Sequence, residues 1–253
     1  HLITIRGRST LADPAVWSGV WCEHIVISDN DMDVGATTGP SWAAHFGAQN
    51  QNSDERTRDV IFERNYVRGN TTTMVCTEAS ERVTIRNNLL VSGFNGTYQA
   101  GVIDVRFRSN AGVPPPSSTY IYNNSIYQVS GAHANFEAVV VYRDPGAPAT
   151  PPTGTVAKNN LVYAPTATSS DYGGGGTPIF IGGSAGTSWT ASSNSSDSQI
   201  KSTAPGFTVP PVALTDWKPT SGYGINGGEY VAIFDDFAQV ARTGTNDMGA
   251  YQP

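Results

Sequence analysis

A small set of ionisable and aromatic side chains could together carry out a β-elimination reaction. They are His45, Asp104, Arg106, Arg108 and Tyr142. Elimination from a uronate removes the proton next to a carboxylate, and an arginine can stabilise the negative charge that builds up on that carboxylate. A base must reach the proton, and an acid must protonate the leaving oxygen. We assign the first role to Arg106 and Arg108, and the roles of base and acid to His45 and Tyr142.

Neighbouring polar residues extend this candidate catalytic row. Thr77, Asp104 and Arg143 are candidates for substrate binding, and Asp104, Glu137 and Asp144 are weaker candidates for metal ligands. A structural interpretation competes with the catalytic one. An outward-facing Asp104 beside Arg106 is commonly a solvated ion pair worth under about 1 kcal/mol. A single histidine such as His45 also commonly serves only as a hydrogen-bonding group.

These residues can be placed together because the chain contains an internal repeat. One asparagine recurs at Asn30, Asn65, Asn88, Asn124 and Asn160, at intervals of 35, 23, 36 and 36 residues. The positions three before and two after each asparagine are apolar, and polar residues lie between them. Repeats of this length indicate a solenoid, in which each unit buries its apolar side against its neighbours. The period-two alternation predicts a strand, a sharp bend and a second strand in each repeat.

Asparagine suits the predicted bend for two reasons. It tolerates the left-handed region of backbone conformation. Identical amides stacked about 4.8 Å apart can also hydrogen-bond along the stack as a ladder. The alternative is a set of unrelated asparagine turns in an antiparallel sandwich, but the matched apolar columns favour the solenoid.

The repeat sets which side chains share a face. Equal counts back from Asn65, Asn124 and Asn160 place Ala44, Ile103 and Val139 in one inward column. His45, Asp104 and Arg106 then point outward. The short 23-residue coil contributes Val75 and Thr77, and we expect Thr77 to lie on the same outward surface.

The repeat and its asparagine ladder resemble the right-handed parallel β-helix of the pectate-lyase-like superfamily, over roughly residues 1–200. The tail, with Ala204-Pro205-Gly206-Phe207 and Asp247-Met248-Gly249-Ala250-Tyr251-Gln252, is similar to the ending of many secreted bacterial β-helix proteins. The resemblance implies an all-β fold, a right-handed parallel β-helix of about seven coils. Residues 1–200 would form the coils, and residues 201–253 a C-terminal coil and capping tail of the same domain.

The resemblance also suggests a function. Lyases of this fold that act on alginate or dermatan, the chondroitinase B-like group, use a Lys–Arg pair with a carboxylate-bound calcium ion. This chain departs from that pattern, because its only lysines are Lys158, Lys201 and Lys218 and none lies in the candidate row. We expect an extracellular lyase that cleaves an acidic, uronate-containing polysaccharide. No cofactor is required by the sequence, although Ca²⁺ is compatible with it.

Two other functions stay open. The first is a non-catalytic polysaccharide-binding, adhesin-like or structural extracellular solenoid that uses exposed aromatic residues. The second is a glycoside hydrolase, for which Asp235 and Asp236 near Glu229 could supply a carboxylate pair.

Composition narrows the partner. The net charge is −6 and the isoelectric point is near 5.1, which argues against nucleic acid. No apolar run approaches the 18 or so residues needed to span a membrane. We therefore expect a polysaccharide partner and a secreted or cell-surface location, with an export signal ahead of His1. The sequence leaves the oligomeric state open.

The two cysteines allow a geometric prediction. Cys22 and Cys76 belong to different columns and are separated by two coils, about 10 Å along the axis. A disulfide requires Cα atoms within about 7 Å. We predict two buried free thiols, with Cys76 pointing inward beside Met74.

Overall fold

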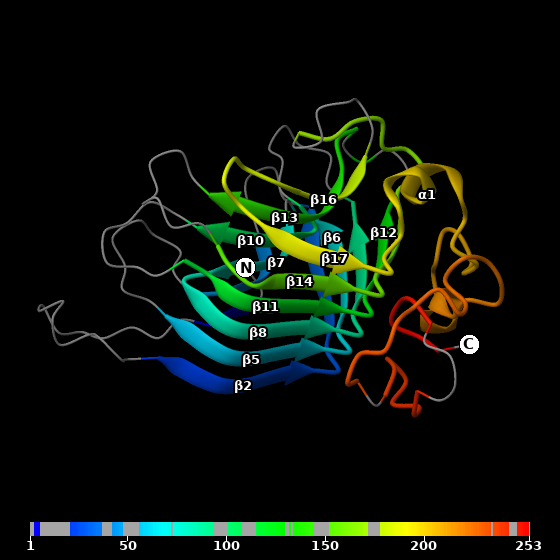
Figure 1. Ribbon diagram of the computed structural model, residues 1–253. Coiled ribbons are helices and arrows are strands. Elements are labelled where there is room, and N and C mark those ends of the chain that lie inside the picture. The colour runs from blue at the N-terminus through cyan, green and yellow to red at the C-terminus, as the bar shows by residue number, and fades with distance from the viewer. Residues whose placement is uncertain are drawn as a thin grey trace, which may run out of the picture.

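The computed structural model describes residues 3–5, 21–36, 42–47, 56–71, 73–93, 101–107, 115–129, 132, 134–143, 152–171, 178–233, 235–242 and 247–252. Within these residues the chain forms a parallel β-helix with three sheets (Figure 1). Each of the first five coils contributes one strand to each sheet, and the sixth contributes a strand to two of the sheets. Equivalent strands of successive coils pair in parallel. The predicted fold class and the predicted stacking of coils are confirmed.

The strands divide among the sheets in a regular order. Sheet 1 contains β1 (Ile3–Ile5), β4 (Trp42–Phe46), β7 (Thr73–Glu78), β10 (Ile103–Phe107), β13 (Glu137–Arg143) and β16 (Ile179–Gly183). Sheet 2 contains β2 (Cys22–Ser28), β5 (Thr57–Glu63), β8 (Ser80–Arg86), β11 (Ser117–Tyr122), β14 (Thr155–Lys158) and β17 (Trp189–Ser192). Sheet 3 contains β3 (Asp31–Ala36), β6 (Tyr66–Asn70), β9 (Leu89–Ser92), β12 (Ser125–Gln128) and β15 (Leu161–Tyr163). The described residues thus supply six coils, where the sequence predicted about seven.

The asparagine ladder lies at the bend between sheets 2 and 3. Each ladder side chain donates from Nδ2 to the Oδ1 of the next, at 2.9 Å for Asn30 to Asn65, 3.2 Å for Asn65 to Asn88, and 2.9 Å for Asn88 to Asn124. The series continues at 2.9 Å to Asn160 and ends at 2.8 Å on Asn194, a sixth rung that the repeat did not reveal.

The left-handed residue at the bend is not the ladder asparagine but the one before it. Positive φ values occur at Asp29, Arg64, Asn87, Asn123, Asn159 and Ser193. This corrects one of the two reasons given for asparagine at the bend. The ladder position is fixed by hydrogen bonding of the amide, whereas the preceding position provides the left-handed turn.

The core is a single column of apolar side chains inside the coils. The residues three before and two after the ladder, such as Phe62, Ile85, Val67 and Leu90, are all buried there, as predicted. Sheet 1 adds Val75, Ile103, Val105, Val139 and Val141. Helix α1 (Asp197–Ser202) follows the last rung and contacts β15 and β16, and its Ile200 is buried in the same core. Helix α1 therefore covers the C-terminal end of the core.

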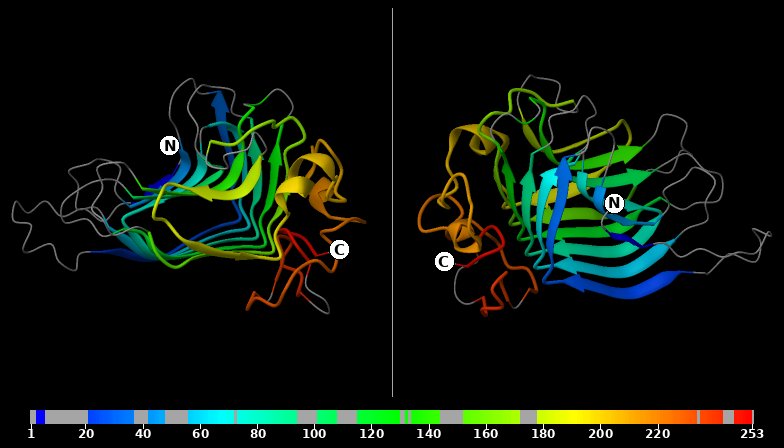
Figure 2. Two further views of the ribbon diagram at one scale, coloured as in Figure 1. Left: turned by 45° about the horizontal axis from the view of Figure 1, so that its top comes forward. Right: turned by 180° about the vertical axis from the view of Figure 1, so that it is seen from behind.

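The tail after α1 runs along the side of the solenoid (Figure 2). Phe207, Trp217 of the short 3₁₀ helix η2 (Leu214–Trp217) and Tyr251 pack with Leu89 and Leu161 on the outer face of sheet 3. The part of the tail that the structure describes thus covers a sheet face, where the sequence analysis expected a cap. In the described part of the chain, no helix is long and apolar enough to cross a membrane.

Candidate functional site

The predicted catalytic row lies on the outer face of sheet 1. His45, Cys76 and Asp104 are directly paired on adjacent strands β4, β7 and β10. Arg106 pairs with Glu78 on one side and with Tyr142 of β13 on the other. Period-two alternation therefore places these six side chains on one face of the sheet. The predicted alignment of Ala44, Ile103 and Val139 is also confirmed, with Val75 completing the column.

Two predictions about the short coil were wrong. Thr77 pairs with Phe46 and Val105, which are core residues, so Thr77 faces the core and cannot bind a polymer on the outer face. Cys76 pairs with His45 and Asp104 and so faces outward, where an inward position beside Met74 was predicted. A register error of one residue reverses the face of every side chain in a strand. The thiols themselves are free, as predicted, but Cys22 is only half-buried.

Most of the row is closed to a polymer. His45, Cys76 and Asp104 are 0% exposed, and Glu78 is 2% exposed. His45 Nε2 lies 3.1 Å from Glu78 Oε2, and the Trp42 ring stacks on the His45 ring with centroids 5.4 Å apart. A buried histidine held in this way is poorly placed to act as a base on a polysaccharide.

The other end of the row reaches solvent. The Arg106 side chain is 19% exposed, and its Nη2 lies 2.8 Å from Asp104 Oδ2. Its guanidinium also lies over the ring of half-buried Tyr142, 5.3 Å from the ring centroid. The ion pair with Asp104 and the contact with the Tyr142 ring thus hold the Arg106 guanidinium in a fixed orientation.

The remaining predicted residues are dispersed. Arg143 pairs with Phe107, one place beyond Tyr142, so alternation turns it to the opposite face from the row. Glu137 accepts hydrogen bonds from Ser170 Oγ at 2.7 Å and from the Asp171 amide at 2.5 Å. Arg108 and Asp144 lie outside the described residues. The structure therefore does not bring Asp104 and Glu137 together as a metal site.

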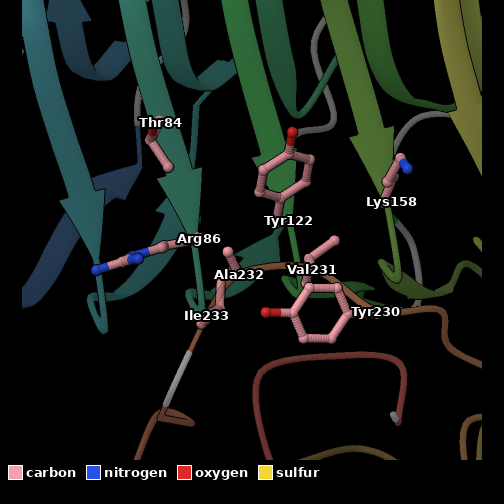
Figure 3. Close-up of a pocket in the computed structure, with 8 residues that line it drawn as sticks. All are labelled: Thr84, Arg86, Tyr122, Lys158, Tyr230, Val231, Ala232 and Ile233. Atoms are coloured by element: carbon pink, nitrogen blue, oxygen red, sulfur yellow. The ribbon is translucent and has the colours of Figure 1, made fainter.

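A second candidate site, which the sequence analysis did not identify, lies on the outer face of sheet 2. Arg86, Tyr122 and Lys158 are directly paired on β8, β11 and β14, two positions before the ladder. Residues 230–233 of the tail cross in front of this row and form the second wall of a groove (Figure 3). The groove has a volume of about 390 Å³, within the usual range for ligand sites. Its lining residues are Thr84, Arg86, Tyr122, Lys158, Tyr230, Val231, Ala232 and Ile233.

An asparagine next to the ladder fixes the tail at the groove. Asn159 Oδ1 accepts a hydrogen bond from the Glu229 amide at 2.8 Å, and Asn159 Nδ2 donates to the Glu229 carbonyl at 2.7 Å. These two bonds place Tyr230 opposite the row. Tyr230 is 74% exposed, so a large aromatic surface faces solvent at this edge of the groove.

Both cations of the groove are held by acids. Arg86 Nη2 lies 2.6 Å from Glu63 Oε2, and Lys158 Nζ lies 3.1 Å from Glu229 Oε1. Hydrogen bonds from Ser192 and Lys158 lower the pKa of Glu229, so it is ionised at neutral pH. Such pairs orient the arginine and lysine while leaving both half-buried side chains at the groove surface.

Tyr122 is neutral at physiological pH. Burial raises the pKa of Tyr122 to about 12, with a smaller contribution from Tyr120. The Tyr120 and Tyr122 rings lie 5.8 Å apart. Tyr122 therefore offers a ring edge and a hydroxyl that both donates and accepts, and it is not a base at physiological pH.

The carboxylates considered for glycoside hydrolysis have other partners. Asp236 is buried, and its carboxylate accepts hydrogen bonds from the amides of Ala238, Val240 and Gln252. Asp235 Oδ2 lies 3.5 Å from Arg64 Nη1. Asp236 therefore orders the tail.

Two groups of side chains among the described residues have metal-ligand spacing, namely His45, Cys76 and Glu78, and Glu23, His24 and Asp59. In the second group, Glu23 and Asp59 are already paired with Arg58 and Arg82.

We compared the chain with family models, curated proteins and solved structures, and no match was found in any of the three comparisons. Membership of the pectate-lyase-like superfamily therefore stays a prediction. The fold and the sites define the protein as a parallel β-helix with an aromatic and cationic groove on one face.

Proposed function

We propose that this protein is an extracellular β-helix protein that binds an acidic polysaccharide in the groove between sheet 2 and the tail. The observation that carries the proposal is the row Arg86–Tyr122–Lys158 facing the exposed ring of Tyr230 across an open groove (Figure 3). This function corresponds to the binding alternative considered from the sequence.

The chemistry of the groove suits a sugar ring with a carboxylate. Aromatic rings such as those of Tyr122 and Tyr230 present an apolar surface with a polar tip, which fits the apolar faces and hydroxyl edges of sugars. Arg86 and Lys158 lie on either side of Tyr122, two strands apart, which corresponds to about 9.6 Å along the solenoid axis. A uronate carboxylate can bind to either cation in exchange for its present carboxylate partner.

The direct test is binding of defined oligosaccharides measured by titration calorimetry. We expect oligogalacturonate or oligoalginate to bind, and a neutral oligosaccharide of equal length to bind more weakly. Because the cations are near the surface, affinity for the acidic ligand should fall as salt is added. Equal affinity for charged and neutral ligands, or no binding of either, would contradict the proposal.

Matched variants locate the site. Arg86→Ala should weaken binding, whereas Arg82→Ala should not, although both arginines lie in β8 and both pair with a carboxylate of β5. Tyr230→Ala should weaken binding about fivefold, as for an aromatic contact worth about 1 kcal/mol. Tyr230 is exposed, so this variant tests binding with little effect on folding.

The lyase reaction is a second candidate function, at the exposed end of the sheet 1 row. The observation that favours it is the Arg106 guanidinium, oriented by buried Asp104 and adjacent to Tyr142. In this proposal Arg106 neutralises the uronate carboxylate. Tyr142, as a phenolate, takes the proton next to that carboxylate and then donates it to the leaving oxygen as the glycosidic bond breaks. His45 is left out of the reaction because it is buried.

Ultraviolet absorbance of the unsaturated product tests the lyase proposal, with alginate, pectate and chondroitin as substrates and with and without Ca²⁺. Activity that Arg106→Ala abolishes would support it. The absence of product from all three polymers would remove it, and the binding proposal would stand independently.

A further inference from the structure

We infer that His45, Cys76 and Glu78 form a binding site for a zinc ion on the buried part of sheet 1. This site is separate from the polysaccharide groove and does not depend on either proposed function.

The β-helix register brings the three side chains together. Cys76 of β7 pairs directly with His45 of β4, and Glu78 lies two residues after Cys76 on the same strand. Direct cross-strand neighbours and residues two apart on one strand both project from the same face of a sheet. One potential ligand atom from each of the three residues lies within 4.8 Å of the other two, and His45 Nε2 is 3.1 Å from Glu78 Oε2.

These separations are close to those of a tetrahedral zinc site. With Zn–S near 2.3 Å and Zn–N or Zn–O near 2.0–2.2 Å, neighbouring donors of a tetrahedron lie about 3.3–3.6 Å apart. Zinc binding therefore requires side-chain rotations that adjust the observed donor spacing to this one. Three protein ligands also leave one tetrahedral position for a further ligand.

The donor types select the metal. A thiolate, an imidazole and a carboxylate suit a borderline ion such as Zn²⁺, whereas Ca²⁺ and Mg²⁺ prefer sites made only of oxygen. The charge of the three ligands also favours a divalent ion. The thiolate and carboxylate together carry two negative charges, which a divalent ion neutralises, and burial makes such neutralisation strongly favourable.

The surroundings support a fixed site. All three residues are buried, and the Trp42 ring stacks on His45 at an interplanar angle of 21°, which restrains the imidazole. The next pair along the sheet, Asp104 and Arg106, is an ion pair and is therefore neutral as a unit. It does not oppose a cation bound beside it.

The same three residue types could instead act as a cysteine nucleophile with its base and orienting acid. A nucleophile must reach a substrate, however, and the exposure of His45, Cys76 and Glu78 is between 0% and 2%. A dehydrated ion requires far less access than a substrate. We therefore propose the metal site, and the reactivity of Cys76 becomes an outcome of the test.

The full-length protein, stripped with a chelator and dialysed, is titrated with ZnCl₂ against a chelating dye and separately with CoCl₂. We expect one equivalent of zinc and a thiolate-to-cobalt charge-transfer band. Changing a residue that only supports a metal ligand typically lowers metal affinity by about tenfold or more. Cys76→Ser or Glu78→Gln, which changes a ligand itself, should therefore weaken zinc binding by at least about tenfold. The controls Cys22→Ser and His24→Ala should bind zinc as the unchanged protein does.

A second measurement covers variants that do not fold. Cys76 is buried, so its thiol reacts with a disulfide reagent only when the protein opens locally. In Cys22→Ser protein, which retains only Cys76, bound zinc should slow this reaction, and removal of zinc should restore its rate. The proposal is overturned if Cys22→Ser protein binds no zinc, if Cys76→Ser binds it equally well, or if the thiol reacts at the same rate with and without zinc.

Discussion

Replacing one central asparagine of the ladder by alanine should destabilise the whole solenoid. Asn124 is fully buried and its side chain makes four hydrogen bonds. Its Nδ2 donates to the Ile85 carbonyl at 3.0 Å and to Asn160 Oδ1 at 2.9 Å. Its Oδ1 accepts from the amide of Asn88 at 3.1 Å and from Asn88 Nδ2 at 2.9 Å. At about 1 kcal/mol net for each bond, Asn124→Ala should cost about 4 kcal/mol.

The control lies in the same column at the start of the ladder. Asn30 is exposed, and among the residues that the structure describes its side chain donates to the Ser28 carbonyl and to Asn65 Oδ1 only. Water can replace both bonds, so we expect Asn30→Ala to cost under about 1 kcal/mol. The two variants therefore change the same residue type at the same bend and differ in burial and in the number of bonds.

Urea unfolding followed by circular dichroism measures both variants, and a thermal scan provides a second estimate. With about 2–4 °C for each kcal/mol in a chain of this size, Asn124→Ala should lower Tm by roughly 8–16 °C. A lower slope in urea would mean that the coils on either side of the change unfold separately. Equal losses for the two variants would refute the claim that the ladder stabilises through buried amide bonds.

Three further predictions concern the backbone, the tail and pH. Gly47 has a φ of 96°, and a Cβ added there would lie 1.4 Å from a carbonyl oxygen of β7. Gly35 has a φ of 65°, and a Cβ added there would meet no atom within 4 Å. In urea unfolding, Gly47→Ala should therefore lower the free energy of unfolding by more than about 3 kcal/mol and Gly35→Ala by about 1–2 kcal/mol. Arg242 donates to three tail carbonyls and to an asparagine of the solenoid wall. Arg242→Gln should therefore release the tail, so that limited proteolysis cuts after residue 202 while the circular dichroism of the sheets is retained. Burial raises the pKa of Tyr223 from 10.0 to about 12. Because the folded protein has the higher pKa, the contribution of Tyr223 to stability is complete below pH 10 and is lost between pH 10 and pH 12. Tyr223→Phe should therefore make the fall in unfolding free energy at alkaline pH shallower.

The fold could be predicted because its apolar columns repeat with the ladder. Each of the first five rungs has apolar residues at both flanking positions, and all of them are buried in the core. The sixth rung was missed because Asn194 is followed two places later by Ser196 instead of an apolar residue. At that point the chain leaves the coil and enters α1, so the signal of the second strand is absent.

The candidate row could be predicted only where the coils have equal length. His45, Asp104 and Val140 each precede their ladder asparagine by the same number of residues, and their pairing was correct. The coil of Asn88 is shorter, so the count from its ladder residue to sheet 1 could not be transferred. Cys76 and Thr77 were exchanged between faces for that reason. Burial of the row was also not predicted, because the alternation pattern tells which face a side chain takes but not whether that face is covered.

The groove was not predicted because the two neighbouring asparagines of each pair, such as Asn87-Asn88 and Asn159-Asn160, have different roles. The second asparagine of each doublet forms the ladder, whereas the first is left-handed and bonds outward: Asn87 Nδ2 donates to the Asp235 carbonyl at 2.9 Å, and Asn159 binds both backbone groups of Glu229. These contacts fix the tail against the bend and thereby place Tyr230 at the groove, facing the row of sheet 2. Formation of the groove is therefore coupled to docking of the tail. A variant that releases the tail, such as Arg242→Gln, should lose polysaccharide affinity even though it leaves every residue of the sheet 2 row unchanged.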